Sequence, residues 1–342
     1  MNREIRGEEL RQYIHNALYT WIDERGFVHA ERFTEKQLEQ YRRDIYMDNT
    51  DFIPRAKCSS TVMLEMVTDS DYIALEHDWH MGMRYEWEDV DFFVDGVNTD
   101  YRLVENEGYR LIGFDIPKGK HDVQIWFPWC DIISLEHVYV DEGAVVEQPP
   151  KKDLRILTFG DSITQGYIGH HPAFNYVGIM ARSLNAECVN QAIGGYWFEG
   201  ASLDPALSEY RPDLITVAYG TNDYSLKGSL EEFRAGVSGF VTRLEEIFPE
   251  VPVLGIIPIY RCDDRLRPRI YTRSYTRDEA MDAIRAEYAK YKNITVLDDT
   301  FFPHPKDYFA PDGVHPNDLG FMVYGKAVTD AIRRMPFMKE RK

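Results

Sequence analysis

The sequence lacks a long apolar run and an apolar leader. Its longest apolar stretch covers residues 251–260, far shorter than the roughly 20 residues that a membrane-spanning helix needs. The first ten residues carry acidic side chains where a signal peptide needs an apolar segment. We therefore expect a cytoplasmic protein that has no membrane partner.

Cysteine is scarce. The four residues Cys58, Cys130, Cys188 and Cys262 form no C-x-x-C pair, so the sequence predicts neither a disulfide framework nor a zinc site. We expect buried, reduced thiols. No other metal site and no cofactor is predicted.

Basic residues are also scarce relative to acidic ones, and the excess of negative charge is concentrated in the first part of the chain. The net charge is −18 for 39 Lys and Arg against 57 Asp and Glu. Residues 1–150 hold 15 basic and 31 acidic residues, a net charge of −16, and residues 151–342 hold 24 and 26, a net charge of −2. Because the acidic first part would repel phosphates, we expect no nucleic-acid partner.

The chain is long enough for two domains, with 342 residues of which 44% are hydrophobic and 13% aromatic. Pro149 and Pro150, followed by charged residues, interrupt any helix or strand. The pattern of elements changes at this point. We therefore predict one domain over residues 1–150 and a second over residues 151–342.

The first domain is predicted to be an antiparallel β-sandwich, similar to a jelly roll, with short leading helices. Residues 34–43 have a helical pattern, and Asp95-Gly96 is a hairpin dipeptide. Turn residues separate the expected strands, which cover residues 61–68, 91–97, 109–116, 122–126 and 132–140.

The second domain is predicted to be a three-layer α/β/α fold, flavodoxin-like, with a parallel sheet. Continuous apolar strands are expected at residues 154–159, 187–192, 214–219, 251–259 and 294–297. Helices are expected at residues 175–184, 230–248, 278–291 and 319–334. Buried strands that alternate with helices indicate a parallel sheet covered on both faces.

Reactive groups gather at the carboxyl ends of parallel strands, so the residues at those ends are the first candidates for a site. The first strand ends in Gly160-Asp161-Ser162, without the G-x-S-x-G of an α/β-hydrolase because residue 164 is Thr. The second ends at Gly194-Gly195, and the third at Gly220-Thr221-Asn222-Asp223. Asp312 and His315 stand three apart near the C-terminus. Each motif alone also fits an ordinary turn.

Together these motifs resemble the SGNH hydrolase superfamily, the GDSL-type esterases, over about residues 153–338. The resemblance implies that Ser162 attacks an ester carbonyl, that His315 transfers the proton, and that Asp312 orients His315. It also implies an oxyanion hole formed by the N–H groups of Ser162 and Gly195 and the amide of Asn222.

A sandwich ahead of such a domain resembles several carbohydrate esterases. This resemblance implies an acetylesterase whose substrate is a small-molecule or oligosaccharide ester. Two alternatives stay open. One is a lipid or thioester hydrolase on the same catalytic domain, and the other is a glycan-binding protein with an inactive partner domain.

The candidate substrate-binding residues are Asp161, Tyr196, Trp197 and Arg261. Tyr196 and Trp197 come directly after the oxyanion glycines, where aromatic side chains either stack on a sugar or pack in the core. Arg261 begins an arginine-rich segment that ends at Arg277. This segment could clamp an anionic group, but we favour a solvated loop paired with nearby aspartates. It could also join protomers, and a homo-oligomer is compatible with the sequence.

Overall fold

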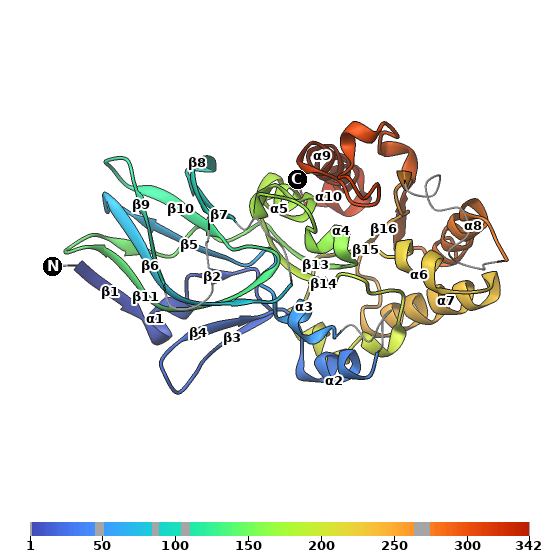
Figure 1. The fold of residues 1–342 in the computed structure, drawn as a ribbon, viewed down its shortest axis with the longest axis horizontal. Helices are drawn as coiled ribbons and strands as arrows, with labels where there is room; N and C mark the ends of the chain where they lie inside the picture. The colour runs from blue at the N-terminus through green and yellow to red at the C-terminus, as the bar shows by residue number, and fades with distance from the viewer. Residues whose placement is uncertain (1, 45–50, 84–88, 104–109, 263–273, 342) are drawn as a thin grey trace. The chain divides into compact units, whose positions relative to one another are not determined.

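The structure is a computed structural model that describes residues 2–44, 51–83, 89–103, 110–262 and 274–341 (Figure 1). The chain divides into two compact units. Unit 1 comprises Met1–Arg32, Pro54–Asp153 and His170–Ala173; unit 2 comprises Phe33–Ile53, Leu154–Gly169 and Phe174–Lys342. Within the described residues, no helix is both long enough and apolar enough to cross a membrane.

Unit 1 consists of antiparallel strands and short helices. Its elements are β1 (Asn2–Arg6), α1 (Gly7–Arg11), β2 (Ile14–His15), β3 (Tyr19–Ile22), β4 (Val28–Glu31), α3 (Ile53–Lys57), β5 (Met63–Thr68), β6 (Tyr72–Met81), β7 (Asp89–Val94), β8 (Val97–Leu103), β9 (Arg110–Asp115), β10 (His121–Trp126), β11 (Asp131–Asp141) and β12 (Val146–Glu147). One sheet has the order β3-β4-β11-β6-β9, with β1 also paired to β11. The other has the order β12-β5-β10-β7-β8, with β2 also paired to β5.

The two sheets of unit 1 share one core. Leu64 and Ile125 from one sheet and Leu75 and Val138 from the other are buried in the same apolar cluster. This arrangement is the predicted sandwich. The hairpin predicted at Asp95 joins β7 to β8, and Asp95 and its following glycine both have the positive φ (50° and 77°) that this turn type requires.

Unit 2 contains the predicted parallel sheet. Its elements are α2 (Glu35–Arg43), β13 (Leu154–Gly160), α4 (Ser162–Gln165), α5 (Tyr176–Ser183), β14 (Ala186–Ala192), β15 (Leu214–Ala218), α6 (Thr221–Leu226), α7 (Leu230–Ile247), β16 (Val253–Ile256), α8 (Arg277–Tyr288), β17 (Ile294–Leu297), α9 (Asp318–Arg334) and α10 (Pro336–Glu340). The strand order is β14-β13-β15-β16-β17, and every pair is parallel.

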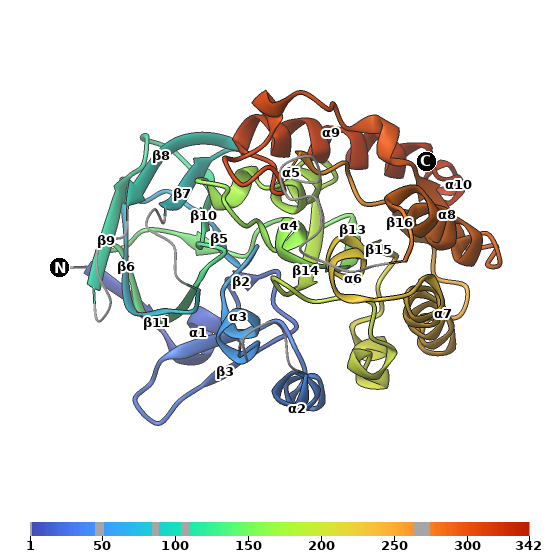
Figure 2. The ribbon, with the colours of Figure 1, turned by 45° about the vertical axis from the view of Figure 1, so that its right-hand side comes forward.

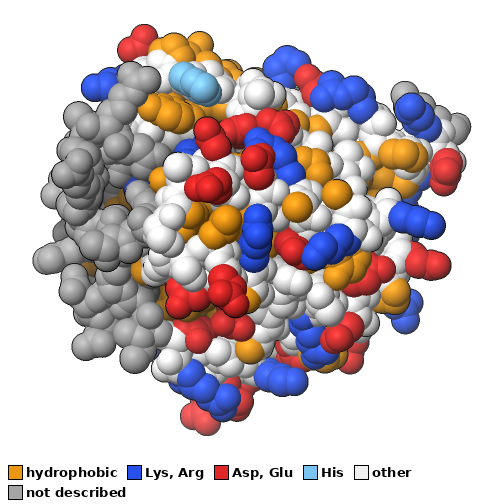
Figure 3. All heavy atoms as spheres, turned by 90° about the vertical axis from the view of Figure 1, so that its right-hand side faces the viewer, with side chains coloured by type: hydrophobic (Ala, Val, Ile, Leu, Met, Phe, Trp, Pro, Cys, Tyr) orange, Lys and Arg blue, Asp and Glu red, His pale blue; other side chains and the backbone are white. Residues whose placement is uncertain are grey.

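Helices cover both faces of this sheet (Figure 2). Gly325 of α9 lies against Ile179 of α5, whereas Phe240 of α7 meets Phe159 of β13 edge-on at 5.9 Å between ring centroids. The α7 and α8 helices begin with capping boxes, as α2 does; such caps are worth about 1 kcal/mol each. Acidic and basic side chains are intermixed on the face that carries α7 and α8 (Figure 3).

The predicted boundary at residue 150 differs from these units in three segments. Residues 151–153 and 170–173 belong to unit 1, and residues 33–53 belong to unit 2. Polar contacts explain the placement of residues 33–53. Gln37 donates to Gln191 Oε1 at 2.7 Å, Thr34 donates to Asp204 Oδ2 at 2.7 Å, and the Tyr196 hydroxyl donates to Asp44 Oδ2 at 2.6 Å. A single break in composition does not reveal such contacts.

Candidate active site

Ser162 is the first residue of α4, directly after β13. Asp161 caps the helix, since its Oδ1 accepts the Ile163 N–H at 3.0 Å. The strand ends in glycine for a steric reason: a Cβ on Gly160 would lie 2.0 Å from Thr164 Oγ1. This tight strand-to-helix turn presents the partly exposed Ser162 at the carboxyl edge of the sheet.

The Asp312–His315 turn brings an oriented imidazole to Ser162. His315 Nε2 lies 2.8 Å from Ser162 Oγ, and His315 Nδ1 lies 2.6 Å from Asp312 Oδ2. Because a carboxylate can only accept, Nδ1 carries the hydrogen, and Nε2 accepts the hydrogen of the serine hydroxyl. The three side chains therefore form a continuous hydrogen-bonded chain.

Asp312 keeps its negative charge in this turn. Burial alone would raise its pKa, but the hydrogen bond and charge of His315 lower it to about 2, with help from the N–H groups of Val314 and His315. Both N–H groups donate to Asp312 Oδ1, at 2.9 and 3.1 Å. An ionised carboxylate is what a histidine needs when it takes up a proton.

Two further strand ends supply hydrogen-bond donors. The Gly194 N–H donates to Gln165 Oε1 at 2.7 Å, whereas no bond from the Gly195 N–H is found among the described residues. Gly195 has a φ of 89°, which glycine adopts readily. On α6, the Asn222 amide donates to Tyr196 O at 2.9 Å and has a second hydrogen. Their use as oxyanion donors stays a prediction.

Two buried carboxyls flank these donors. Burial raises the pKa of Asp161 to about 7, although the Ile163 N–H opposes the shift. Burial likewise raises the pKa of Asp223 to about 7, although its Oδ1 accepts the Phe198 N–H at 3.1 Å. Asp161 is only 2% exposed, so its carboxyl serves the α4 cap and offers little surface to a substrate.

Tyr196 and Trp197 lie in the interior of unit 2. The Tyr196 side chain is fully buried, stacks on Trp197 at 4.9 Å, and meets Tyr41 and Phe52 edge-on. It thus offers no exposed surface for the substrate contact that we predicted. Trp197 is 9% exposed, and the Lys227 ammonium lies 5.7 Å from its ring centroid.

The arginine-rich segment is described only at its two ends. Arg261 Nη1 donates to Ser225 Oγ at 2.8 Å, which places its guanidinium beside α6, and its positive charge opposes the rise in the pKa of Asp161 that burial causes. Arg277 donates to Asp299 Oδ2 at 2.8 Å, and this aspartate lies 22 positions further along the chain. Arg265, Arg267, Arg269 and Arg273 lie outside the described residues.

The sequence did not point to Tyr167, which touches the catalytic candidates. Its ring centroid lies 4.5 Å from that of His315, with the planes tilted by 56°. Its N–H donates to Ser162 O at 2.9 Å. The only signal in the sequence is an aromatic residue directly after Gly166, and no spacing rule marks it.

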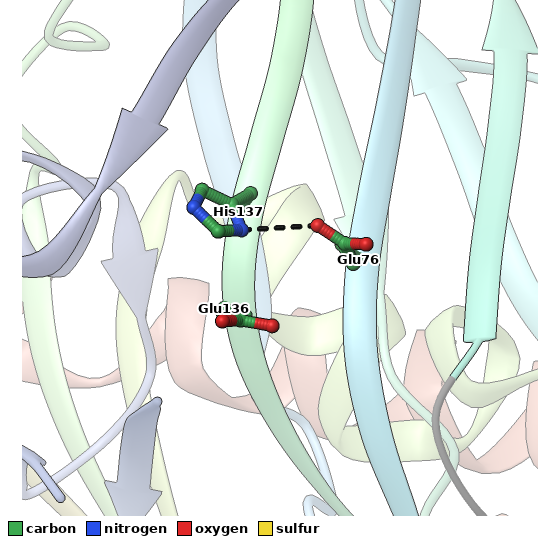
Figure 4. A group of neighbouring side chains, drawn as sticks. All are labelled: Glu76, Glu136 and His137. Carbon is green, nitrogen blue, oxygen red and sulfur yellow. Dashed lines mark hydrogen bonds and ion pairs between the residues drawn. The ribbon is translucent and has the colours of Figure 1, made fainter. Parts of the chain in front are cut away.

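Among the described residues, one group has the side chains and the spacing to hold a metal ion (Figure 4). The ligand atoms of Glu76, Glu136 and His137 all lie within 4.8 Å of one another on β6 and β11. However, His137 Nδ1 lies 3.0 Å from Glu76 Oε2, and the Tyr139 hydroxyl donates to the same oxygen at 2.6 Å. These contacts stabilise Glu76 without an ion, so we interpret the group as a hydrogen-bonded cluster.

Residues 158–323 match the model of the GDSL-like lipase/acylhydrolase family. The matched range includes Ser162, Gly195, Asn222 and the Asp312–His315 turn. The chain carries a GDSL-like lipase/acylhydrolase domain. This domain makes the chain an ester hydrolase, as the sequence predicts, and the α/β/α fold of unit 2 agrees with it. No curated protein sequence matches the chain.

Solved structures share the fold of this acylhydrolase over its whole length. The salicylyl-acyltransferase SsfX3 from a tetracycline biosynthetic pathway is 19% identical, with a TM-score of 0.79. A putative GDSL-like lipase from Bacteroides ovatus is 18% identical, with a TM-score of 0.76. A family two carbohydrate esterase from Cellvibrio japonicus is 15% identical, with a TM-score of 0.68. Each comparison covers 98% of both chains. At these identities the likeness concerns the fold alone.

Proposed function

We propose that the protein is a serine O-acetylesterase that acts on acetylated oligosaccharides in the cytoplasm. The observation that carries this proposal is the hydrogen-bonded chain from Asp312 through His315 to Ser162. It stands at the carboxyl edge of a parallel sheet, where α/β enzymes bind their substrates. The buried thiols of all four cysteines fit a reducing compartment.

The proposed reaction has two steps. His315 Nε2 takes the proton of Ser162 as Oγ attacks the ester carbonyl, and then gives that proton to the departing alcohol. Water, activated by the same nitrogen, releases acetate from the acetyl-serine. The ionised Asp312 stabilises the positive charge on His315 in both steps.

The oxyanion of each tetrahedral intermediate would lie among the N–H groups of Ser162 and Gly195 and the amide of Asn222. This role is supported by the hydrogen-bonding of the neighbours. Gly194 already donates to Gln165, and Asn222 keeps one amide hydrogen after donating to Tyr196 O. Preorganised donors of this kind commonly give the largest single contribution to acyl-transfer catalysis.

We propose an acetyl group rather than a long acyl chain. This part of the proposal is supported by Tyr196 and Trp197, two large, buried and mutually stacked side chains that directly follow Gly195 in the chain. The carbohydrate part of the proposal draws on the sandwich-plus-hydrolase architecture and on the likeness in fold to the family two carbohydrate esterase.

Acyl transfer to an alcohol is a second candidate, because the salicylyl-acyltransferase shares the fold over 98% of both chains. The chemistry up to the acyl-serine is the same in both cases. The acceptor distinguishes them: an esterase gives acetate in water, whereas a transferase forms a new ester when an alcohol is supplied.

The test compares kcat/KM for para-nitrophenyl acetate and para-nitrophenyl octanoate, with Ser162→Ala as the control. We expect a preference for acetate of at least about tenfold, and a loss of about 10⁴-fold or more in the variant. A preference for octanoate would favour a lipid or thioester substrate. Hydrolysis that persists in Ser162→Ala would contradict the serine mechanism and favour the glycan-binding alternative.

A further inference from the structure

We infer that Tyr167 forms part of the subsite for the alcohol portion of the ester and thereby helps to select the sugar. This inference rests on the proposed function. Tyr167 is joined to both reacting residues: its N–H donates to Ser162 O at 2.9 Å, and its ring lies 4.5 Å from the His315 ring. The side chain is partly exposed, so a substrate can reach it.

The backbone around Tyr167 adopts rare conformations. Gly166 has a φ of 104°, and Ile168 has a φ of 72°. A left-handed conformation is unusual for a β-branched residue. Such conformations gather in segments where function requires a fixed geometry. The Gly169 N–H closes the turn by donating to Gly166 O at 3.0 Å, so the turn holds Tyr167 against His315.

The chemistry of acylation places the departing alcohol next to this ring. The bond between Ser162 Oγ and the acyl carbon forms, and the bond from that carbon to the alcohol oxygen breaks. The serine proton passes through His315 Nε2 to the departing oxygen, which must lie within about 3 Å of that nitrogen. A sugar attached to this oxygen therefore approaches the groups that line His315, and Tyr167 is one of them.

A tyrosine ring suits one face of a pyranose. The ring covers apolar C–H groups, and the hydroxyl can exchange hydrogen bonds with sugar hydroxyls. An aryl leaving group differs in two respects: it departs without needing protonation, and it lacks hydroxyls. Tyr167 should thus matter for a sugar acetate and matter little for an aryl acetate that carries the same acyl group.

The experiment compares wild type, Tyr167→Ala, Tyr167→Leu and Tyr167→Phe with a mono-O-acetylated methyl xyloside, which keeps free sugar hydroxyls, and with para-nitrophenyl acetate. Tyr291→Ala is the matched control, because Tyr291 is a partly buried tyrosine three residues before β17, which is an edge strand of the sheet. Circular dichroism checks the fold of each variant, and Tyr167→Leu retains bulk if Tyr167→Ala does not fold.

For Tyr167→Ala and Tyr167→Leu, we expect kcat/KM on the xyloside to fall about tenfold or more, because the sugar loses an aromatic contact that would be covered when it binds. On para-nitrophenyl acetate we expect a change below about threefold. Tyr167→Phe should keep most of the selectivity, and Tyr291→Ala should match wild type on both substrates.

Equal losses on both substrates, with a displaced pH profile, would overturn the inference and make Tyr167 a positioning residue for His315. No loss on either substrate would overturn it as well. Ser162→Ala, measured in parallel, separates the two proposals: if that variant still hydrolyses both esters, the serine mechanism fails and the inference fails with it. If it is inactive, the Tyr167 result is decisive by itself.

Discussion

The aspartates on the two sides of Ser162 have pKa values that are shifted in opposite directions. On the base side, Asp312 has a pKa lowered to about 2, because His315 and two N–H groups bind its carboxylate. On the oxyanion side, burial raises the pKa values of Asp161 and Asp223 to about 7. Asp161 and Asp223 follow β13 and β15, and Asp312 lies in the turn before α9. Their hydrogen-bond partners and burial, not their residue type, set the charge.

This difference matches the charges that develop during ester cleavage. A positive charge forms on His315, where an ionised neighbour stabilises it. A negative charge forms on the ester oxygen, where neutral donors stabilise it and further anions would oppose it. The proposed mechanism is therefore favoured by an ionised carboxylate on one side of Ser162 and by carboxyls that release their protons less readily on the other.

The largest expected effect comes from removing the charge on the base side. Asp312→Asn keeps the shape of the turn but offers His315 an amide, which favours the wrong tautomer. We expect kcat to fall by about 10³–10⁴-fold, measured at saturating para-nitrophenyl acetate. Asp307→Asn, a change at an exposed aspartate nearby in the sequence, is the control. Activity within about threefold of wild type would mean that Asp312 does not orient His315.

A smaller effect is expected from removing a donor on the oxyanion side. Asn222→Ala should lower kcat by about 10²–10³-fold with little change in KM, since the donor acts mainly on the transition state. Steady-state kinetics with the same ester separates the two constants. A rise in KM at unchanged kcat would show that Asn222 binds the substrate equally in the ground state and the transition state. Asn222 would then not be an oxyanion donor.

The smallest effect concerns the pH dependence of stability. The folded-state pKa of Asp223 is raised from 3.8 to about 7, so between these values the folded protein holds a proton that the unfolded chain has released. Stability from this group is full below the lower value and declines as pH rises toward the upper one. Asp223→Asn cannot lose a proton, and its amide oxygen can still accept the Phe198 N–H.

Calorimetric Tm values from about pH 4 to about pH 7 test this expectation. The Asp223→Asn protein should lose less Tm across this window than wild type does. Asp161→Asn should behave in the same way, since its pKa is raised to about 7 for the same reason. Parallel plots of Tm against pH for wild type and both variants would contradict the conclusion that burial raises the pKa values of Asp161 and Asp223.

Much of unit 2 could be predicted from the sequence because its signals are local. The apolar run of β13, the Asp161-Ser162 turn and the Asp312–His315 spacing each lie within a few residues. The parallel topology then brings the strand ends together. The motif favours Gly195 over Gly194 as the oxyanion donor, and the Gly194 bond to Gln165 is compatible with it.

Other features depend on contacts between distant residues. Strand β6 carries Glu76, His77 and Asp78 in succession. Three consecutive polar side chains do not predict a strand in the middle of a sheet. Strand β6 nevertheless lies between β11 and β9, and burial there lowers the pKa of His77 to about 4. The bond between Tyr196 and Asp44, 152 positions apart, and the left-handed Ile168 beside Tyr167 leave no sequence signal.

The most direct test of the serine mechanism is the intact mass of the protein after reaction with diethyl para-nitrophenyl phosphate, which phosphorylates activated serines. We predict a single diethylphosphoryl adduct that maps to the peptide containing Ser162, appears in step with the loss of esterase activity, and is absent from Ser162→Ala. The Asp312→Asn protein should acquire the adduct much more slowly. An adduct on another residue, or full inactivation without an adduct on Ser162, would contradict the account.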